Sequence, residues 1–247
     1  MAYWTSLAVL SQVAGEIGLP RPPTITGLSD VQSVQLLSLL NSAGNELLLY
    51  YPWEQFTKEY AFNIVADIGE YPVPDDYRYF TDQTQWDRTN HWPLLGPKSP
   101  QEWAFIKGAL VAALPRIRYR IQNGLIKTWP VLTSTSSPST VSIAMEYVSK
   151  NWVRPITRDP VTPDRDMILE DTDTVMYDPW LLVKFVKLKF YELKGLNTAG
   201  VQGEFMRIFN SLTGKDTGAE ILSLSRTPIS SLLTSRAIPD GSWNVNP

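Results

Sequence analysis

The segment from Ser29 to Tyr51 constrains the fold most, because it is the longest stretch whose apolar residues recur at helical spacing. It predicts one long helix that ends before Pro52, since a proline disfavours the helical conformation of the residue before it. Ser29 and Gln32 match a capping box at the helix start. The apolar positions are too widely spread for a single stripe, so partner helices should cover more than one side. They are Val31, Val34, Leu36, Leu37, Leu39, Leu40, Ala43, Gly44, Leu47, Leu48, Tyr50 and Tyr51.

Helical segments near the two ends of the chain supply these partners. Apolar spacing predicts a short helix over residues 3–17. Asp178-Pro179 matches a helix start, with the aspartate as cap and the proline at the first helical position, and Gly195 matches a helix stop. A further helix is predicted over about residues 198–212, with Gly214 beyond its end. These last two helices should form an antiparallel pair, because their connection is short.

Between these helical segments the apolar pattern changes to the period of two that is typical of strands. Thr57–Val65 and Val141–Tyr147 are predicted strands. Asn123-Gly124 is the favoured pair for a tight turn and predicts a β-hairpin. Ser99–Trp103 has the capping pattern of a short helix. The acidic residues 159–178 predict a solvated connector.

The predicted fold class is α+β, with a discontinuous helical part. Residues 1–55 and 178–222 should form a helical bundle, and residues 56–177 should form an inserted β-rich lobe. Residues 223–247 should form an extended C-terminal tail. The sequence shows no internal repeat.

The C-terminal tail carries apolar residues in small groups without helical or strand periodicity, and Pro228 and Pro239 favour an extended chain. We interpret it as a docking arm that orders against a neighbouring protein. The alternative is a strap that lies back on the chain's own bundle. The candidate contact residues are Ile229, Leu232, Leu233, Ile238 and Trp243.

Composition excludes several kinds of site. The chain has no cysteine, which excludes a cysteine nucleophile, disulfides and thiolate zinc sites. A net charge of −3 argues against a dedicated nucleic-acid-binding protein, which would normally be basic. No apolar run reaches the length of a membrane span, and the N-terminus lacks the basic flank of a signal peptide. We therefore expect a soluble protein that is made in the cytoplasm.

The motifs that could carry enzyme chemistry are weak. Asp75-Asp76 is an adjacent carboxylate pair, but neighbouring side chains in a turn point apart, which does not suit paired acid and base catalysis. His91 is the only histidine and is interpreted as structural. The acidic segment lacks the spacing of a calcium loop, and no glycine-rich phosphate loop is present. The sequence predicts no enzyme activity, no cofactor and no metal.

Arg116, Arg118 and Arg120 alternate with apolar residues, which predicts three guanidinium groups on one face of a strand. The simpler interpretation is a solvated face whose aliphatic stems cover apolar surface. The functional interpretation is a cationic stripe that meets an acidic surface on a neighbour, with the acidic connector of another copy as the candidate.

Tryptophan is the remaining candidate for ligand contact, with nine residues in the chain. Tryptophan rings can stack on sugars, but these lie at the ends of predicted elements, where they would also fill a core. We favour the core. The residues considered are Trp53, Trp86, Trp92, Trp103, Trp129 and Trp152.

Several segments occur in a characteristic order along the chain. The LPRPP connector and the long LLSLLNSAGNELL helix precede the most specific part, the succession of EYPVPDDY, QTQWDRT and LLGPKSPQEW, and the segment FNSLTGKDTGAEILSL follows. In this order, nearly the whole chain, up to about Leu224, resembles podovirus-type phage head-to-tail adaptor proteins, also called tail tubular or portal-accessory proteins.

The resemblance implies a structural virion protein without enzyme activity. It would form a ring, in that family commonly of twelve copies, at the head-to-tail junction. The implied partners are other copies of the chain, the portal protein, the tail nozzle protein and genome DNA, which passes through the lumen without specific binding. The alternative is a tryptophan-rich carbohydrate-binding or tail-fibre module of a phage.

Overall fold

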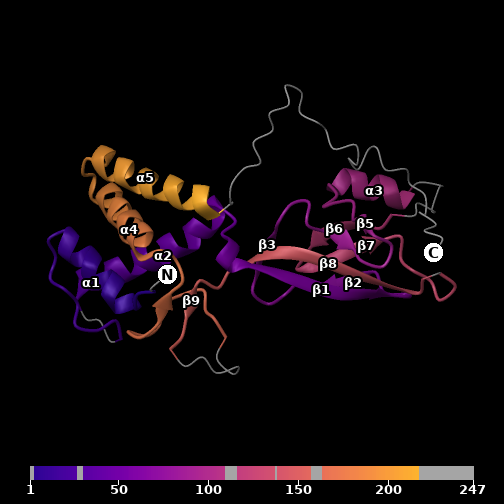
Figure 1. Ribbon diagram of the computed structural model, residues 1–247, viewed down its shortest axis with the longest axis horizontal. Helices are drawn as coiled ribbons and strands as arrows, with labels where there is room; N and C mark the ends of the chain where they lie inside the picture. The colour runs from indigo at the N-terminus through magenta and orange to yellow at the C-terminus, as the bar shows by residue number, and fades with distance from the viewer. Residues whose placement is uncertain (1–2, 27–29, 109–115, 137, 157–162, 217–247) are drawn as a thin grey trace. The chain divides into compact units, whose positions relative to one another are not determined.

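The protein, seen in a computed structural model, is described for residues 3–26, 30–108, 116–136, 138–156 and 163–216. In this part of the chain five α-helices and several antiparallel strand pairs are present, which confirms a mixed α+β fold. The chain divides into two compact units (Figure 1). Among the described residues, the helical unit combines those up to Thr57 with those from Val148 to Asp216, and the β-rich lobe comprises those from Lys58 to Tyr147.

The helical unit is organised around α4 (Pro179–Lys194), which packs against α1 (Ser6–Glu16), α2 (Val31–Tyr50) and α5 (Ala199–Asp216). Figure 1 shows these four helices gathered together. We expected the long helix α2 to occupy the central place. However, half of α4 is buried, with residues from more than one side of the helix. They are Pro179, Leu181, Leu182, Val183, Phe185, Val186, Leu188 and Phe190.

The ends of α4 confirm both predicted signals. The Asp178 carboxylate accepts hydrogen bonds from the backbone N–H groups of Trp180 and Leu181, at 3.0 and 3.2 Å. Gly195 ends the helix with a positive φ of 66°, a conformation that costs glycine little. In contrast, α5 runs past Gly214 to Asp216, since one glycine weakens a helix by only about 1 kcal/mol.

The predicted start of α2 is wrong by one residue. The N-cap is Asp30, whose carboxylate accepts from both the backbone N–H and the hydroxyl of Ser33, each at 3.0 Å. The buried face accordingly begins at Ser33, and Val31 is 80% exposed although we placed it in the apolar stripe. The buried residues are Ser33, Leu36, Leu40, Ala43, Gly44, Leu47 and Leu48.

Residues 148–156 and 163–177, which we expected in the β-rich lobe, belong to the helical unit. Trp152 is completely buried, and its indole N–H donates to the carbonyl of Asp166 at 2.8 Å. A small antiparallel pair follows, in which β9 (Val153–Arg154) joins β10 (Thr174–Val175). This segment therefore contributes a large buried side chain to the helical core.

The acidic segment also differs from the solvated connector we predicted, as far as the structure describes it. The Asp171 carboxylate accepts from the hydroxyl of Thr24 at 2.7 Å and from the backbone of Ile25. Asp173 is fully buried and accepts from the backbone N–H groups of Leu169 and Glu170, both at 2.9 Å. These carboxylates hold loops of the helical unit together.

The β-rich lobe is built from two antiparallel sheets. The larger has the strand order β1-β8-β4-β5 with β3 also paired to β8, and the smaller has the order β2-β7-β6. The strands are β1 (Thr57–Val65), β2 (Glu70–Pro72), β3 (Tyr77–Phe80), β4 (Trp86–Asp87), β5 (Trp92–Pro93), β6 (Arg118–Gln122), β7 (Leu125–Trp129) and β8 (Thr140–Ser149). The short helices are η1 (Glu54–Phe56), which precedes β1, and α3 (Pro100–Gly108).

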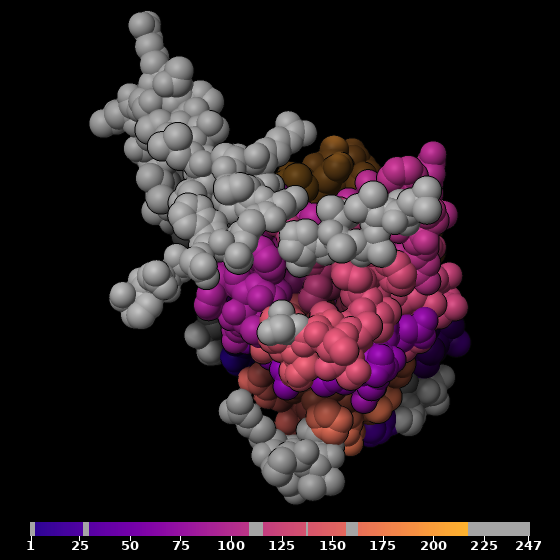
Figure 2. All heavy atoms as spheres, turned by 90° about the vertical axis from the view of Figure 1, so that its right-hand side faces the viewer, coloured from indigo at the N-terminus to yellow at the C-terminus, as the bar shows by residue number. Residues whose placement is uncertain are grey.

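Side chains from both sheets form one core in this lobe, and Figure 2 shows the surface of one of its faces. The predicted strand residues Val141, Ile143, Met145 and Tyr147 are all buried in it. The other members are Ile64, Tyr71, Phe80, Leu94, Ile117, Tyr119 and Ile126.

Two local predictions in this lobe are confirmed. Strands β6 and β7 form the predicted hairpin, in which Asn123 and Gly124 have positive φ values of 55° and 70°. At the start of α3, Ser99 and Glu102 form a reciprocal capping box. The Ser99 hydroxyl accepts from the Glu102 backbone at 3.2 Å, and the Glu102 carboxylate accepts from the Ser99 backbone at 3.1 Å.

Candidate interaction surfaces

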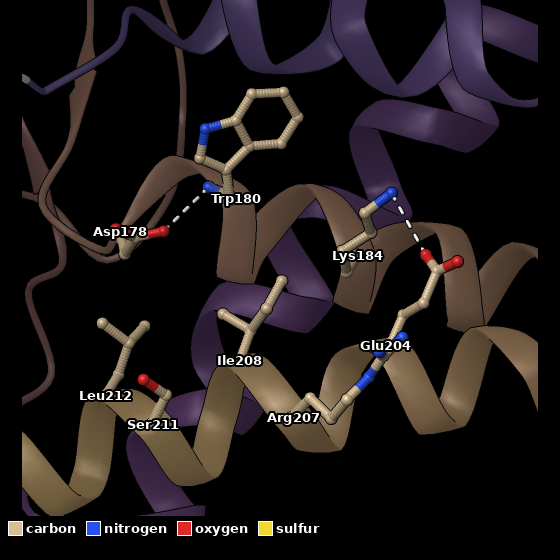
Figure 3. A pocket seen from close by; sticks show the side chains of 8 residues that line it. All are labelled: Asp178, Trp180, Lys184, Glu204, Arg207, Ile208, Ser211 and Leu212. Carbon is tan, nitrogen blue, oxygen red and sulfur yellow. Dashed lines mark hydrogen bonds and ion pairs between the residues drawn. The ribbon is translucent and has the colours of Figure 1, made fainter.

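A groove of about 660 Å³ runs between α4 and α5 (Figure 3). Trp180 lies on the α4 side and is 45% exposed, although its ring packs edge-on against Trp4 at 5.3 Å. Ile208 and Leu212 lie on the α5 side. An apolar groove between two helices can bind an apolar side chain or a helix of a partner protein.

Charged residues line one end of this groove. The ammonium of Lys184 lies 2.9 Å from the Glu16 carboxylate and 3.2 Å from the Glu204 carboxylate. Lys187 lies 3.0 Å from the same Glu16. Since these residues come from α1, α4 and α5, the network ties three helices together.

The Glu16 carboxylate makes this network sensitive to acid. Burial alone would raise the pKa of Glu16, but hydrogen bonds and charge attraction from Lys184 and Lys187 outweigh it, so the pKa falls below 4.5. A lowered folded-state pKa adds stability above the unfolded value, and this stability is lost as the pH falls through the folded value. We expect Glu16→Gln to lower the melting temperature at neutral pH and to reduce the loss of stability below about pH 4.5. Thermal unfolding between pH 3 and 7 measures both effects, and parallel curves for the two proteins would contradict the assignment.

A second, smaller hollow of about 380 Å³ lies among α2, α4 and α5. Its aromatic side chains are packed against one another, with Phe185 stacked on Phe205 at 4.7 Å and Tyr50 edge-on to Phe185 at 5.8 Å. The hydroxyl of Tyr50 donates to Glu46 at 2.6 Å, which, with burial, raises the pKa of Tyr50 to about 12. Tyr50 therefore stays a neutral donor at any ordinary pH.

Our sequence interpretation did not predict that Trp180 is exposed and lines this groove. The signal was available, because this tryptophan follows Pro179 in the first turn of α4 and lies off the apolar stripe of that helix. An apolar ring outside the stripe predicts an exposed aromatic contact residue.

The structure separates the predicted arginine row. Arg116 precedes β6 and is only 3% exposed, so the interpretation of a three-arginine face is wrong for this residue. Arg118 and Arg120 do share one face of β6 and are partly exposed. Their cross-strand neighbours are Trp129 and Lys127. The arginine face is thus smaller than predicted and contains an aromatic ring.

The described part of the acidic segment, which we considered as the partner of these arginines, has several carboxylates engaged within its own unit. Asp171 and Asp173 accept hydrogen bonds from loops, and Asp178 caps α4. Arg165 lies 3.6 Å from Asp173 and 3.7 Å from Glu170. These carboxylates are poorly placed to serve a second copy.

The remaining predicted contact residues belong to the C-terminal tail. Ile229, Leu232, Leu233, Ile238 and Trp243 lie outside the described residues.

The two weak catalytic candidates have other partners. Asp76 pairs with Lys58 at 2.7 Å and accepts from the Tyr147 hydroxyl at 2.8 Å, whereas Asp75 is exposed. His91 lies exposed in a turn with a positive φ of 59°. Within the described ranges, no three or more His, Asp or Glu side chains gather closely enough to hold a metal ion.

The tryptophans divide between core and surface. Trp53, Trp103 and Trp152 are buried, as expected for core residues. Trp86 is exposed, so the core prediction is wrong for it. Trp92 and Trp129 are partly buried, and the indole N–H of Trp92 donates to Asp87.

The motifs that carry the family resemblance hold the β-rich lobe together. In WDRT, the buried Asp87 carboxylate accepts from the backbone of Thr89 and Asn90, both at 2.9 Å, and from the indole of Trp92 at 3.0 Å. In LLGPKSPQEW, a Cβ on Gly96 would lie 2.5 Å from the carbonyl oxygen of Tyr119. These positions are therefore constrained by folding.

Replacing Asp87 by alanine should destabilise the lobe by at least about 2 kcal/mol. The reason is that several donors, whose hydrogen bonds to Asp87 are only partly exposed to water, lose their acceptor, at about 1 to 3 kcal/mol each where water cannot replace it. Urea unfolding followed by tryptophan fluorescence measures this effect. Asp75→Ala is the matched control, and an equal effect of the two substitutions would contradict the role assigned to Asp87.

No helix among the described residues has the length and apolarity that crossing a membrane requires. In comparisons with known proteins, no family model and no curated protein matches the chain.

Proposed function

We propose that this protein is a structural, non-enzymatic part of a podovirus-type phage virion. In this proposal it forms a ring that joins the portal vertex to the tail nozzle at the head-to-tail junction. The observation that carries the proposal is the succession of EYPVPDDY, QTQWDRT and LLGPKSPQEW, by which the sequence resembles the adaptor proteins of such phages.

The structural roles of these motifs support the proposal. Asp76, Asp87 and the Ser99–Glu102 capping box each fix a turn or a helix start in the lobe. A resemblance at such positions is a resemblance of fold, because folding constrains these residues more tightly than surface positions. The lobe is inserted between helices from the two ends of the chain, which is the order that the resemblance implies.

The proposed partners are further copies of the chain, the portal protein, the nozzle protein and genome DNA. The groove lined by Trp180, Ile208 and Leu212 offers an apolar contact surface for the protein partners. The predicted docking arm, residues 223–247, offers a second. DNA would pass through the ring without specific binding.

We expect the purified protein to show no duplex DNA binding at physiological salt. The affinity of proteins for DNA comes mainly from contacts of basic side chains with phosphates, whereas this chain has a net charge of −3. An electrophoretic shift assay with duplex DNA, with a basic DNA-binding protein as positive control, measures this. Retention that persists at physiological salt would contradict the passive conduit.

Co-elution with the portal ring tests the proposed function. The protein is mixed with the purified portal ring of the same phage and separated by size-exclusion chromatography. We expect it to elute with the portal. A protein that keeps the elution volume of a 28 kDa monomer beside an intact portal ring, and instead binds glycans in an array, would favour the carbohydrate-binding alternative.

A further inference from the structure

Two arginines of the β-rich lobe lie together and form no ion pair with the described residues. Arg118 and Arg120 are separated by one residue on β6, so their side chains leave the same face of the strand. Among the described residues neither has an ion pair, whereas four other basic residues of this lobe do. Those pairs are Lys58–Asp76, Arg88–Glu59, Lys98–Glu102 and Lys127–Glu70.

Two carboxylates of the same lobe are also exposed and lack an ion pair within the described part of the chain. Asp82 lies in the turn after β3, and Glu146 lies on β8. The backbone N–H of Thr81 donates to the carbonyl of Glu146 at 2.9 Å, which brings this turn against β8. The Glu146 N–H donates in turn to the Thr84 hydroxyl at 3.1 Å. Asp82 and Glu146 are therefore close neighbours.

The two arginines and Glu146 lie on opposite sides of the core of the lobe. Tyr119 stands between Arg118 and Arg120 on β6 and is completely buried, so its ring points into the core and their side chains point away. Glu146 stands on β8 between Met145 and Tyr147, which are buried in the same core as Tyr119, so its side chain points away from that core on the side of the larger sheet. The lobe thus has a basic side and an acidic side.

We propose that neighbouring copies of this protein dock head to tail through the β-rich lobe, with Arg118 and Arg120 of one copy against Asp82 and Glu146 of the next. This inference rests on the proposed ring and identifies a contact between its subunits. A head-to-tail contact uses two different patches on each copy. It generates a ring when the rotation from one copy to the next adds up to a full turn.

The chemistry of the two patches suits such a contact. A guanidinium binds a carboxylate through two parallel hydrogen bonds, so two arginines facing two carboxylates would fix both distance and register. Trp129, cross-strand from Arg118, adds an apolar ring beside the basic patch. Charged contacts of this kind govern partner choice and association rate more than affinity, while like charges placed opposite each other are strongly unfavourable.

Reciprocal charge reversal tests the contact. The first variant is Arg118→Glu with Arg120→Glu, and the second is Asp82→Arg with Glu146→Arg. Each alone opposes like charges and should weaken assembly on the portal ring about tenfold or more. An equal mixture should restore assembly, because each variant then meets a complementary patch on both sides. The number of copies bound per portal ring, measured by mass photometry, is the readout.

The expected product of the mixture is a ring with equal numbers of the two variants, which native mass spectrometry can count. Lys194→Glu with Lys215→Glu is the control, because it makes the same charge change as the first variant at exposed positions of the helical unit. Full assembly of both reversal variants alone would overturn the inference. Failure of the folded variants to restore assembly when mixed would also overturn it.

A neutral variant covers the case in which a reversal variant does not fold. Arg118→Gln with Arg120→Gln should assemble more slowly than the wild type at low salt and should lose most of the salt dependence of the association rate. An unchanged salt dependence would overturn the inference. If the wild type itself does not bind the portal ring, the proposed function fails, which is a separate result from failure of the charge reversal.

Discussion

Replacing Trp152 by alanine is expected to destabilise the helical unit by about 3 to 5 kcal/mol, the range for a large aromatic side chain removed from a core. Trp152 is completely buried, and its indole N–H donates to Asp166. The substitution therefore leaves a cavity and removes one of the two donors to the Asp166 carbonyl, which also accepts from the side-chain amide of Asn45 at 3.2 Å. Thermal unfolding followed by far-UV circular dichroism measures the loss.

Gly44 packs against Trp152, and substituting both residues tests this packing more specifically. A Cβ on Gly44 of α2 would lie 2.5 Å from Cε2 of Trp152, which is too close for any real contact. Gly44→Ala should therefore destabilise the wild type by about 1 to 3 kcal/mol, as overpacking does. In the Trp152→Ala background the same substitution should instead stabilise by about 1 kcal/mol, because alanine is the better helix former.

A change of sign between the two backgrounds is the expected outcome of this double-mutant cycle. Gly203→Ala on α5 is the control, since no atom lies within 4 Å of a Cβ there, and it should be stabilising in both backgrounds. Additive effects of Gly44→Ala and Trp152→Ala would show that the two residues do not share one packing site.

Deleting residues 225–247 is expected to abolish attachment to the portal ring while leaving the melting temperature unchanged. The deleted segment has apolar residues without the periodicity of a helix or a strand, so it is unsuited to form a core of its own. Binding to a partner would supply the missing apolar burial. Differential scanning fluorimetry and co-elution with the portal ring measure the two effects.

A control variant separates the apolar contact from the length of the arm. Leu232→Ser with Leu233→Ser keeps the length and removes two apolar side chains, and it should also weaken attachment. A truncated protein that unfolds early would favour the strap interpretation instead. Normal attachment of the truncated protein would disprove the docking arm.

Local signals in the sequence were sufficient for much of the fold. The Asp178-Pro179 start of α4, the capping box at Ser99 and the Asn123-Gly124 turn are correct. Each depends on hydrogen bonds or dihedral angles within a few residues, which the sequence encodes directly. The buried stripe of β8 was predictable for the same reason, because its alternation lies within one strand.

Long-range packing could not be predicted in this way. Nothing in the local pattern around Trp152 says that it fills the space beside Gly44, more than a hundred residues away in the chain. Similarly, Arg116 continues the alternation of Arg118 and Arg120 but lies before β6 and is buried. The acidic residues before Asp178 indicated the net charge of that segment but not the partners of its carboxylates. Asp171 pairs with the loop at Thr24, and Asp173 pairs with Arg165.

The candidate surfaces likewise include one that local sequence signals predict and others that depend on long-range packing. The arginine face was visible in the sequence because strand alternation is local, although its size was overestimated. The opposite acidic patch, Asp82 with Glu146, arises only when the turn after β3 packs against β8. The groove beside Trp180 likewise requires α4 and α5 to be placed together.

Negative-stain electron microscopy of the protein mixed with the portal ring of the same phage tests the ring adaptor most directly. We predict class averages with extra density below the portal ring and rotational symmetry that matches it, and side views that show a second ring stacked on the first. Portal rings without added density, beside separate monomeric particles of this protein, would contradict the account.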